Sequence, residues 1–146
     1  MDEFLNGSGL SVDMLLCEAA QLAAGKLYIL GGGVAFVGPA PRPLAIAMQI
    51  TVPWNQANVQ YKWRIDLLDE DGHPVVAKSK PVAVQGTFEA HRPPGLRPGS
   101  PLGVSLVINL SPLPLPGGKS YTFALAIDDE HQPNWRLRFF MKPRPS

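Results

Sequence analysis

Short stretches of alternating apolar and polar residues run along most of this chain. In residues 44–52 one face carries Leu44, Ile46, Met48, Ile50 and Val52, and the other carries Ala45, Ala47, Gln49 and Thr51. In residues 61–67, Tyr61, Trp63, Ile65 and Leu67 alternate with Lys62, Arg64 and Asp66. Because successive side chains of a strand point to opposite faces, a period of two indicates strands.

The same period returns further along, between segments rich in turn residues. Strands are predicted at residues 75–80, 82–89, 102–110, 121–127 and 135–141. Asp71-Gly72 marks a turn after the strand at 61–67, Pro-rich loops follow at 91–101 and 112–118, and a short helical turn is expected at 53–58. About eight or nine short strands with no sustained helix predict an all-β fold. We expect a two-sheet antiparallel sandwich of the immunoglobulin-like or C2-like type.

Residues 11–24 allow two interpretations. Their Leu, Ala, Glu and Gln content favours a helix, with Ser11 as its N-cap and Gly25 just beyond its end. A hairpin competes, with a strand at 12–19, a turn at 20–25 and a returning apolar strand at 26–31. The glycines at 31–33 and the prolines up to Pro43 then indicate a loop.

The pattern also suggests where the folded domain begins and ends. Residues 1–10 lack a period and contain Gly-Ser-Gly, so we expect a flexible leader there. Residues 11–142 are predicted to form a single domain, and residues 143–146 a C-terminal tail. With 146 residues, the chain can form one sizeable core.

Three segments resemble one protein family. They are LLCEAAQLAAGKLYILGGG at 15–33, PLAIAMQITVPW at 43–54 and LLDEDGHPV at 67–75. With them the chain resembles an uncharacterised, largely actinobacterial family of small β domains, a domain of unknown function. The resemblance implies a hairpin around Gly25-Lys26 rather than a helix, and it implies no activity and no site.

Charge and cysteine content narrow the classes of partner and compartment. Lys and Arg number 13 against 12 Asp and Glu, a formal net charge of +1, which argues against nucleic acid or an anionic membrane as partner. Residues 43–61 are uncharged, but prolines and amide side chains interrupt them, so no membrane span is expected. Cys17 is the single cysteine and cannot form an internal disulfide, which predicts a reducing, cytoplasmic location.

Acidic residues and histidines lie in three of the predicted loops, at 69–73, 90–101 and 128–134. If nine strands alternate in direction, these three loops share one end of the fold. That end would hold the candidate metal ligands Asp69, Asp71, His73, His91, Asp128, Asp129 and His131. Carboxylates suit calcium and clustered imidazoles suit zinc, although acidic residues in turns also serve turn geometry and solvation.

A second group of positions points to a partner surface. Small or apolar side chains occupy faces that should be wet, namely Ala45, Ala47, Val107, Ala124, Ala126 and Phe140. Such faces are covered either by a partner or by another part of the same chain. Trp54, an aromatic residue in a connection, is a further candidate contact, with packing on the core as its alternative.

Catalytic arrangements are missing from the sequence. There is no nucleophile elbow around a serine, and Cys17 lies in an apolar segment where an inert core thiol is expected. Arg136, Arg138, Lys142 and Arg144 with Phe140 could contact single-stranded nucleic acid, but they also suit an ordinary solvated strand face. We therefore expect a non-enzymatic interaction or accessory module, without a cofactor, that contacts a protein partner or its own copy. The alternative is a domain that binds a metal ion or small ligand at the three loops.

Overall fold

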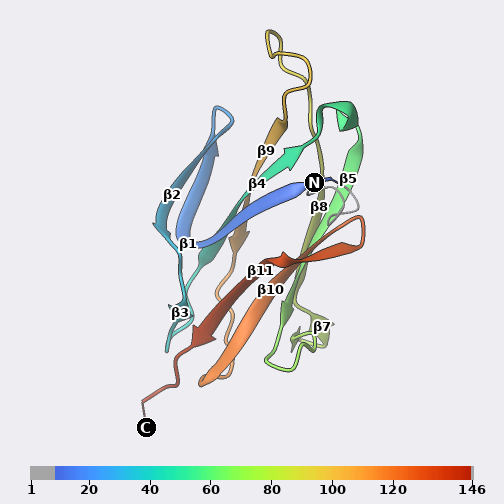
Figure 1. Ribbon diagram of the computed structural model, residues 1–146. Helices are drawn as coiled ribbons and strands as arrows, with labels where there is room; N and C mark the ends of the chain where they lie inside the picture. The colour runs from blue at the N-terminus through green and yellow to red at the C-terminus, as the bar shows by residue number, and fades with distance from the viewer. Residues whose placement is uncertain (1–8, 146) are drawn as a thin grey trace.

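The computed structural model describes residues 9–145, and this part of the chain is all-β apart from one short 3-10 turn (Figure 1). In chain order the elements are β1 (Ser11–Ala23), β2 (Lys26–Gly32), β3 (Phe36–Val37), β4 (Leu44–Val52), the 3-10 turn Trp54–Gln56, β5 (Gln60–Leu68), β6 (Val76–Ala77), β7 (Lys80–Pro81), β8 (Ala83–Glu89), β9 (Leu102–Leu110), β10 (Lys119–Ile127) and β11 (Glu130–Met141). Several match the predicted strands, and β4 and β9 coincide with residues 44–52 and 102–110.

Two larger sheets organise the fold. One has the strand order β2-β1-β4-β9, the other has the order β3-β11-β10-β5-β8, and β6 and β7 form a separate ribbon. Neighbouring strands are antiparallel except β3, which runs parallel to the end of β11. In Figure 1 the first sheet curls strongly, and the turn end of the β1–β2 hairpin projects from the molecule.

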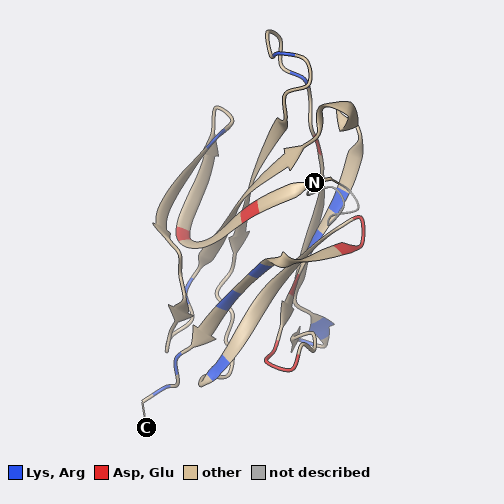
Figure 2. Ribbon diagram, viewed as in Figure 1, with Lys and Arg blue, Asp and Glu red and all other residues tan. Residues whose placement is uncertain are grey.

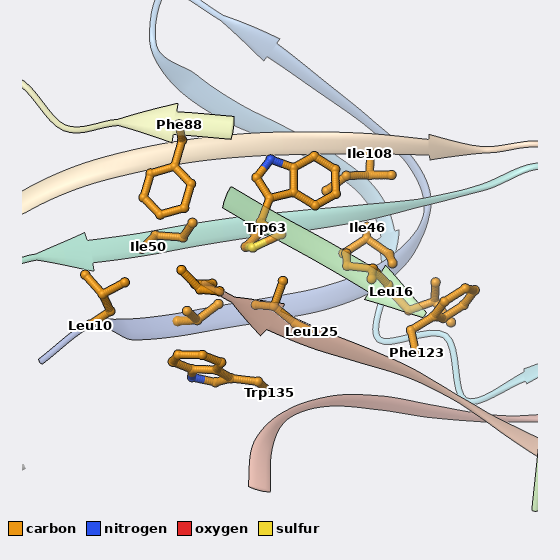
Figure 3. Close-up of a cluster of buried hydrophobic side chains, with 14 of the residues drawn as sticks. Leu10, Leu16, Ile46, Ile50, Trp63, Phe88, Ile108, Phe123, Leu125 and Trp135 are labelled. Atoms are coloured by element: carbon orange, nitrogen blue, oxygen red, sulfur yellow. The ribbon is translucent and has the colours of Figure 1, made fainter. Parts of the chain in front are cut away.

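The main core lies between the two larger sheets. Ile46 and Ile50 from β4 meet Trp63 from β5, Leu125 from β10 and Trp135 from β11 (Figure 3). All five side chains are buried, and each is worth about 1.5–3 kcal/mol when removed from water. The predicted inward faces of β4 and β5 are thus the faces that supply the core.

Residues 11–24 form a strand, and the hairpin interpretation is confirmed. The predicted turn at 20–25 is wrong in extent, because β1 runs to Ala23 and only Ala24 and Gly25 turn the chain. Both have positive φ, 51° and 73°, which is the type I′ geometry that matches the twist of the flanking strands. Tertiary packing overrides the helix propensity of the alanines, since Ala20 packs against Ala45 and Ala47 of β4.

The same hairpin explains two of the outward alanines. β1 pairs with β4 up to Cys17 and then continues with β2 alone, bending so that the hairpin rises beside the sheet (Figure 1). Ala20 and Leu27 cover a small second core of Cys17, Ala45 and Ala47. Ala45 and Ala47 are therefore buried by the protein's own chain rather than left for a partner.

Several predicted boundaries need correction. The strand expected at 75–80 is instead part of the β6–β7 ribbon, because Lys78 and Ser79 adopt positive φ and reverse the chain after two residues. β11 begins at Glu130, inside the loop predicted at 128–134, since only Asp128 and Asp129 form the turn. β3 lies in the segment expected to be a loop.

The predicted leader also needs revision at its end. Leu10 was expected to belong to it, yet Leu10 is only 1% exposed and is part of the main core (Figure 3). Most of the leader, residues 1–8, lies outside the described residues, as does Ser146 of the predicted tail.

Candidate functional site

Exposed apolar side chains gather on the β1–β2 hairpin. Of the eleven large hydrophobic residues that are exposed in the described part of the chain, five lie there: Leu15, Leu22, Tyr28, Ile29 and Leu30. Leu30 is 72% exposed and Tyr28 is 57% exposed. Single exposed apolar residues are ordinary, but a cluster of them on one projecting element indicates an interaction surface.

The strand ladder places these side chains on the two faces of the hairpin. Tyr28 pairs with Gln21 and Leu30 pairs with Ala19, so Tyr28 and Leu30 share the face that points away from the small second core. Ile29 pairs with Ala20 on the opposite face. We call Tyr28, Leu30 and Ile29, with Leu15 and Leu22, the hairpin surface.

β2 is also an unprotected edge strand. Because the two-residue turn fixes Ala23 and Lys26 as a hydrogen-bonded pair, the N–H and C=O groups of Leu27 and Ile29 point away from β1. Gly31 has a positive φ of 61° and interrupts this extended pattern. No strand pairs with that side in the described residues. Between Leu27 and Leu30 there is no charge, proline or bulge of the kind that normally blocks edge pairing.

The hairpin surface carries little charge. Between residues 14 and 32 the charged residues are Glu18 and Lys26, and Figure 2 shows the hairpin almost wholly without charged positions. Lys26 follows the turn at the tip of the hairpin, whereas the Glu18 side chain lies across Gly31 near its base. The surface is thus an apolar strip with a positive tip and a negative base.

The structure does not bring the three metal-candidate loops to one end of the fold. β8 and β10 both run antiparallel to β5, so His91 and the Asp128–Asp129 turn lie at the end of this sheet where β5 begins. The turn at 69–73 follows the other end of β5. The predicted cluster was wrong because residues 75–80 add no strand to the sheet, which changes the direction of every later strand in the count.

Within the turn at 69–73, Asp69, Asp71 and His73 do lie together. Their possible ligand atoms all fall within 4.8 Å of one another. However, Asp69 Oδ1 already accepts hydrogen bonds from the backbone N–H groups of Asp71 and His73, both at 2.9 Å. The His73 bond above all lowers the pKa of Asp69, so this group is explained as an Asx-type turn.

The remaining metal candidates serve local structure. His91 Nδ1 lies 2.9 Å from Asn58 Oδ1, and Asp128 Oδ1 accepts a 2.9 Å hydrogen bond from the Lys62 backbone N–H. Asp129 completes the β10–β11 turn with positive φ. His131 is exposed on β11, where it pairs with Ala126.

The two predicted contact residues differ in how available they are. Trp54 is held in place, because the Arg92 guanidinium lies 4.4 Å from its ring centroid and donates to its carbonyl oxygen at 2.7 Å and 3.2 Å. Trp54 is also partly buried against the core, so the packing alternative accounts for it. Phe140 is exposed beside its β3 partner Phe36, whose ring is covered by the Lys142 ammonium at 4.5 Å.

Three of the small or apolar positions that the sequence predicted to face outward remain: Ala124 and Ala126 on β10, and Val107 on β9. Ala124 and Ala126 are buried and Val107 is half-buried. Ala126 lines an open groove of about 720 Å³ with Lys62, Arg64, Gln85, Thr87 and Asp128. Arg136 and Arg138 are exposed on the same face, and neither has an ion-pair partner among the described residues. These residues form a mixed-charge solvated face.

Cys17 lies in the small second core and is fully buried. Its Sγ donates a 3.3 Å hydrogen bond to the Ala45 carbonyl oxygen, and burial raises the pKa of the thiol. A protonated, inaccessible thiol is a poor nucleophile, so the expectation of an inert core cysteine agrees with this geometry.

Sequence reasoning missed the hairpin surface. The segment KLYILGG reads as a buried strand, because it is apolar on both faces. The available signal was that polar residues do not return on either face of this segment. In the partner strand, the polar Gln21 lies opposite Tyr28 and the small Ala19 lies opposite Leu30, so neither covers its partner with a large apolar side chain.

Comparison with known proteins gives one informative match. A family model described as a family of unknown function (DUF6941) matches residues 12–140. No match was found among curated proteins. Among the described residues, no helix is both long and apolar enough to cross a membrane.

Proposed function

Because the chain belongs to this family of unknown function, we propose its role from its surface: a non-enzymatic interaction module whose β1–β2 hairpin binds another protein chain. The observation that carries the proposal is the hairpin surface itself, where Tyr28 and Leu30 are the most exposed large apolar side chains on a projecting element. An aromatic and an aliphatic anchor side by side are the type of residues on which protein interfaces depend.

The backbone supports the same role. The free N–H and C=O groups of β2 offer main-chain hydrogen bonds to an added strand, and the exposed side chains supply contacts on its two faces. The rest of the molecule provides a rigid base, because β1 continues from the hairpin into the main core through Leu16 and Val12.

Two finer features belong to this proposal. The packing of the two larger sheets around one core supports a sandwich of the immunoglobulin-like or C2-like class. A buried single thiol and the absence of an apolar helix of membrane length in the described residues support a cytoplasmic protein.

The test compares three tagged chains in capture and sedimentation experiments. These are the wild type, the double variant Tyr28→Ser/Leu30→Ser, and Val76→Ser as a matched control. Val76 is 61% exposed on the separate β6–β7 ribbon, so its replacement removes a similar exposed apolar group elsewhere. All three are expected to keep the wild-type melting temperature, because exposed side chains contribute little to stability.

The proposal predicts that the wild type and the Val76 variant retain the same bound chain, either another protein or an untagged copy. The double variant should lose it. Retention of that chain by the double variant would show that the hairpin is not the contact surface. A wild-type chain that retains nothing and sediments as a monomer at all concentrations would refute the proposal.

A further inference from the structure

Basic residues gather at the end of the fold where β11 finishes. Residues 33–43, 110–119 and 136–145 meet there, because β3 pairs with β11 and the Gly118 N–H donates a 2.7 Å hydrogen bond to the Met141 carbonyl oxygen. These three segments contain none of the chain's 12 Asp and Glu residues. They hold six of its 13 Lys and Arg residues, namely Arg42, Lys119, Arg136, Arg138, Lys142 and Arg144. The net charge of +1 therefore hides an uneven distribution.

Three of these cations have no acidic residue beside them. Arg42 and Lys142 line an open groove of about 330 Å³, and Lys142 and Arg144 line a second open groove of about 460 Å³. Among the described residues, no Asp or Glu lines either groove. The other three cations lie closer to the acidic turn at 69–73. Because exposed charges are largely screened beyond about 8 Å at physiological salt, a partner at these two grooves meets positive charge.

Two exposed aromatic rings lie among the same cations. Phe140 of β11 pairs with Phe36 of β3, so their side chains share one face of the sheet. Phe36 is 56% exposed, and the Lys142 ammonium lies 4.5 Å from its ring centroid. The described part of the chain has three other phenylalanines, and all of them are buried. Figure 2 shows blue positions and no red ones from the second half of β11 to the C-terminus.

The combination of positive charge and exposed rings narrows the kind of anionic partner. An acidic peptide has carboxylates for the cations but no flat groups for the ring faces, and the bases of a duplex are already stacked on one another. Phe140 has Arg138 and Lys142 as neighbours on its strand face, so it cannot enter a bilayer without taking two charges with it. Single-stranded nucleic acid offers both free base faces, which stack on aromatic side chains, and phosphates, which pair with Lys and Arg.

We propose that Phe36, Arg42, Phe140, Lys142 and Arg144 form a binding surface for single-stranded nucleic acid, which we call the basic end. Bases stack on the phenylalanine rings, and phosphates pair with the guanidinium and ammonium groups. The basic end shares no residue with the hairpin surface, so the inference goes beyond the proposed function and does not depend on it. A module with both surfaces holds a protein chain and a nucleic acid together.

Fluorescence anisotropy of the full chain with labelled oligothymidylate and oligouridylate, each of about 16 nucleotides, tests the inference. The charge variant is Arg42→Gln/Lys142→Gln/Arg144→Gln. It should bind about ten-fold more weakly or worse, and the slope of log affinity against log salt should fall by about 2, because each phosphate contact on a single strand contributes about 0.7 to that slope.

A matched control removes the same charge elsewhere. Lys26→Gln/Lys80→Gln/Arg97→Gln replaces three exposed cations outside the basic end. This control should keep the wild-type salt slope, because no phosphate contact is lost. An equal loss of slope in the control and in the charge variant would show diffuse attraction to the whole protein and contradict the assigned surface.

The aromatic part of the surface has a different signature. Phe140→Ser should weaken binding by about five-fold or more, since a stacked base is lost, while the salt slope stays unchanged. Phe36→Ser provides a second variant, and Val76→Ser removes an exposed apolar group elsewhere as the control. Circular dichroism and melting temperature check that each variant is folded. Wild-type affinity in both phenylalanine variants would remove stacking from the account.

Other results would overturn the inference outright. One is a wild-type protein that binds neither oligonucleotide, and another is one that binds a duplex of the same length as tightly. Binding to phosphatidylserine vesicles or to polyglutamate that the charge variant loses, without binding to either oligonucleotide, would make a membrane or an acidic protein the partner instead. None of these results bears on the hairpin, which is tested by capture through Tyr28 and Leu30.

Discussion

At the scale of single residues, burial separates side chains that hold the fold from side chains that are available to a partner. Leu125 is fully buried between the sheets, whereas Leu30 is mostly exposed. We expect Leu125→Ala to lower the free energy of unfolding by about 2–5 kcal/mol, because it leaves a cavity. Leu30→Ala should change it by less than about 0.5 kcal/mol. Urea unfolding measures both, and equal losses would contradict the assignment of Leu30 to the surface.

Gly86 is a residue whose small size is required by packing. A Cβ atom at this position would lie 2.8–2.9 Å from the Trp63 ring. Gly86→Ala is therefore expected to destabilise the protein by about 1–3 kcal/mol, as overpacking does. Gly33→Ala is not a matched control because of its positive φ, so Gly103→Ala, where the nearest atom is 3.8 Å away, serves instead. A Gly86 variant as stable as the Gly103 variant would show that Trp63 moves freely.

Asp69 is expected to make the stability of the protein depend on pH through the turn at residues 69–73. Its pKa is lowered in the folded protein by backbone hydrogen bonds, so its stabilising effect is present above the unfolded-state pKa and is lost as the pH falls through the folded-state pKa. Asp69→Ala should lower the melting temperature at neutral pH, and the difference from the wild type should shrink in acid. Asp69→Asn keeps an acceptor oxygen and serves as the control. A difference that is constant with pH would contradict this role.

The same turn predicts the response to metal ions. Because one Asp69 oxygen already accepts two backbone hydrogen bonds, we expect calcium and zinc to leave the melting temperature unchanged. A rise with either ion that Asp71→Asn abolishes would show instead that Asp69, Asp71 and His73 bind it.

At the scale of elements, strands with a regular alternation of apolar residues were predictable, and strands with unusual surroundings were not. β4, β5 and β9 follow from a period of two, because one of their faces meets the core. β6 and β7 could not be separated from a longer strand, since the positive φ of Lys78 and Ser79 leaves no mark in their residue types. β3 has two residues, too few for any period.

The turn of the hairpin gives a prediction at this scale. Ala24 adopts a positive φ that an L-residue with a Cβ resists, while asparagine adopts it more readily. Ala24→Asn should therefore stabilise the protein by up to about 1 kcal/mol, measured by thermal unfolding. A loss of stability would show that the turn is not of type I′ in solution.

At the scale of the whole molecule, the composition and alternation fixed the all-β class, whereas the assembly of loops and surfaces depended on strand direction. One wrongly counted strand at 75–80 was enough to gather Asp69, His91 and Asp128 at one end, where the structure separates them. The hairpin surface could not be predicted from the sequence for a different reason. Whether KLYILGG is covered depends on the bend of β1 at Cys17, which no local pattern specifies.

The most direct test of the account is hydrogen–deuterium exchange of the β2 backbone in the wild-type protein at low and high concentration. If β2 pairs with another chain, exchange in residues 26–32 slows as the complex forms, while residues 76–81 of the exposed β6–β7 ribbon exchange at an unchanged rate. Exchange in residues 26–32 that stays equally fast at every concentration, and in the presence of any captured protein, would contradict the hairpin as an interaction surface.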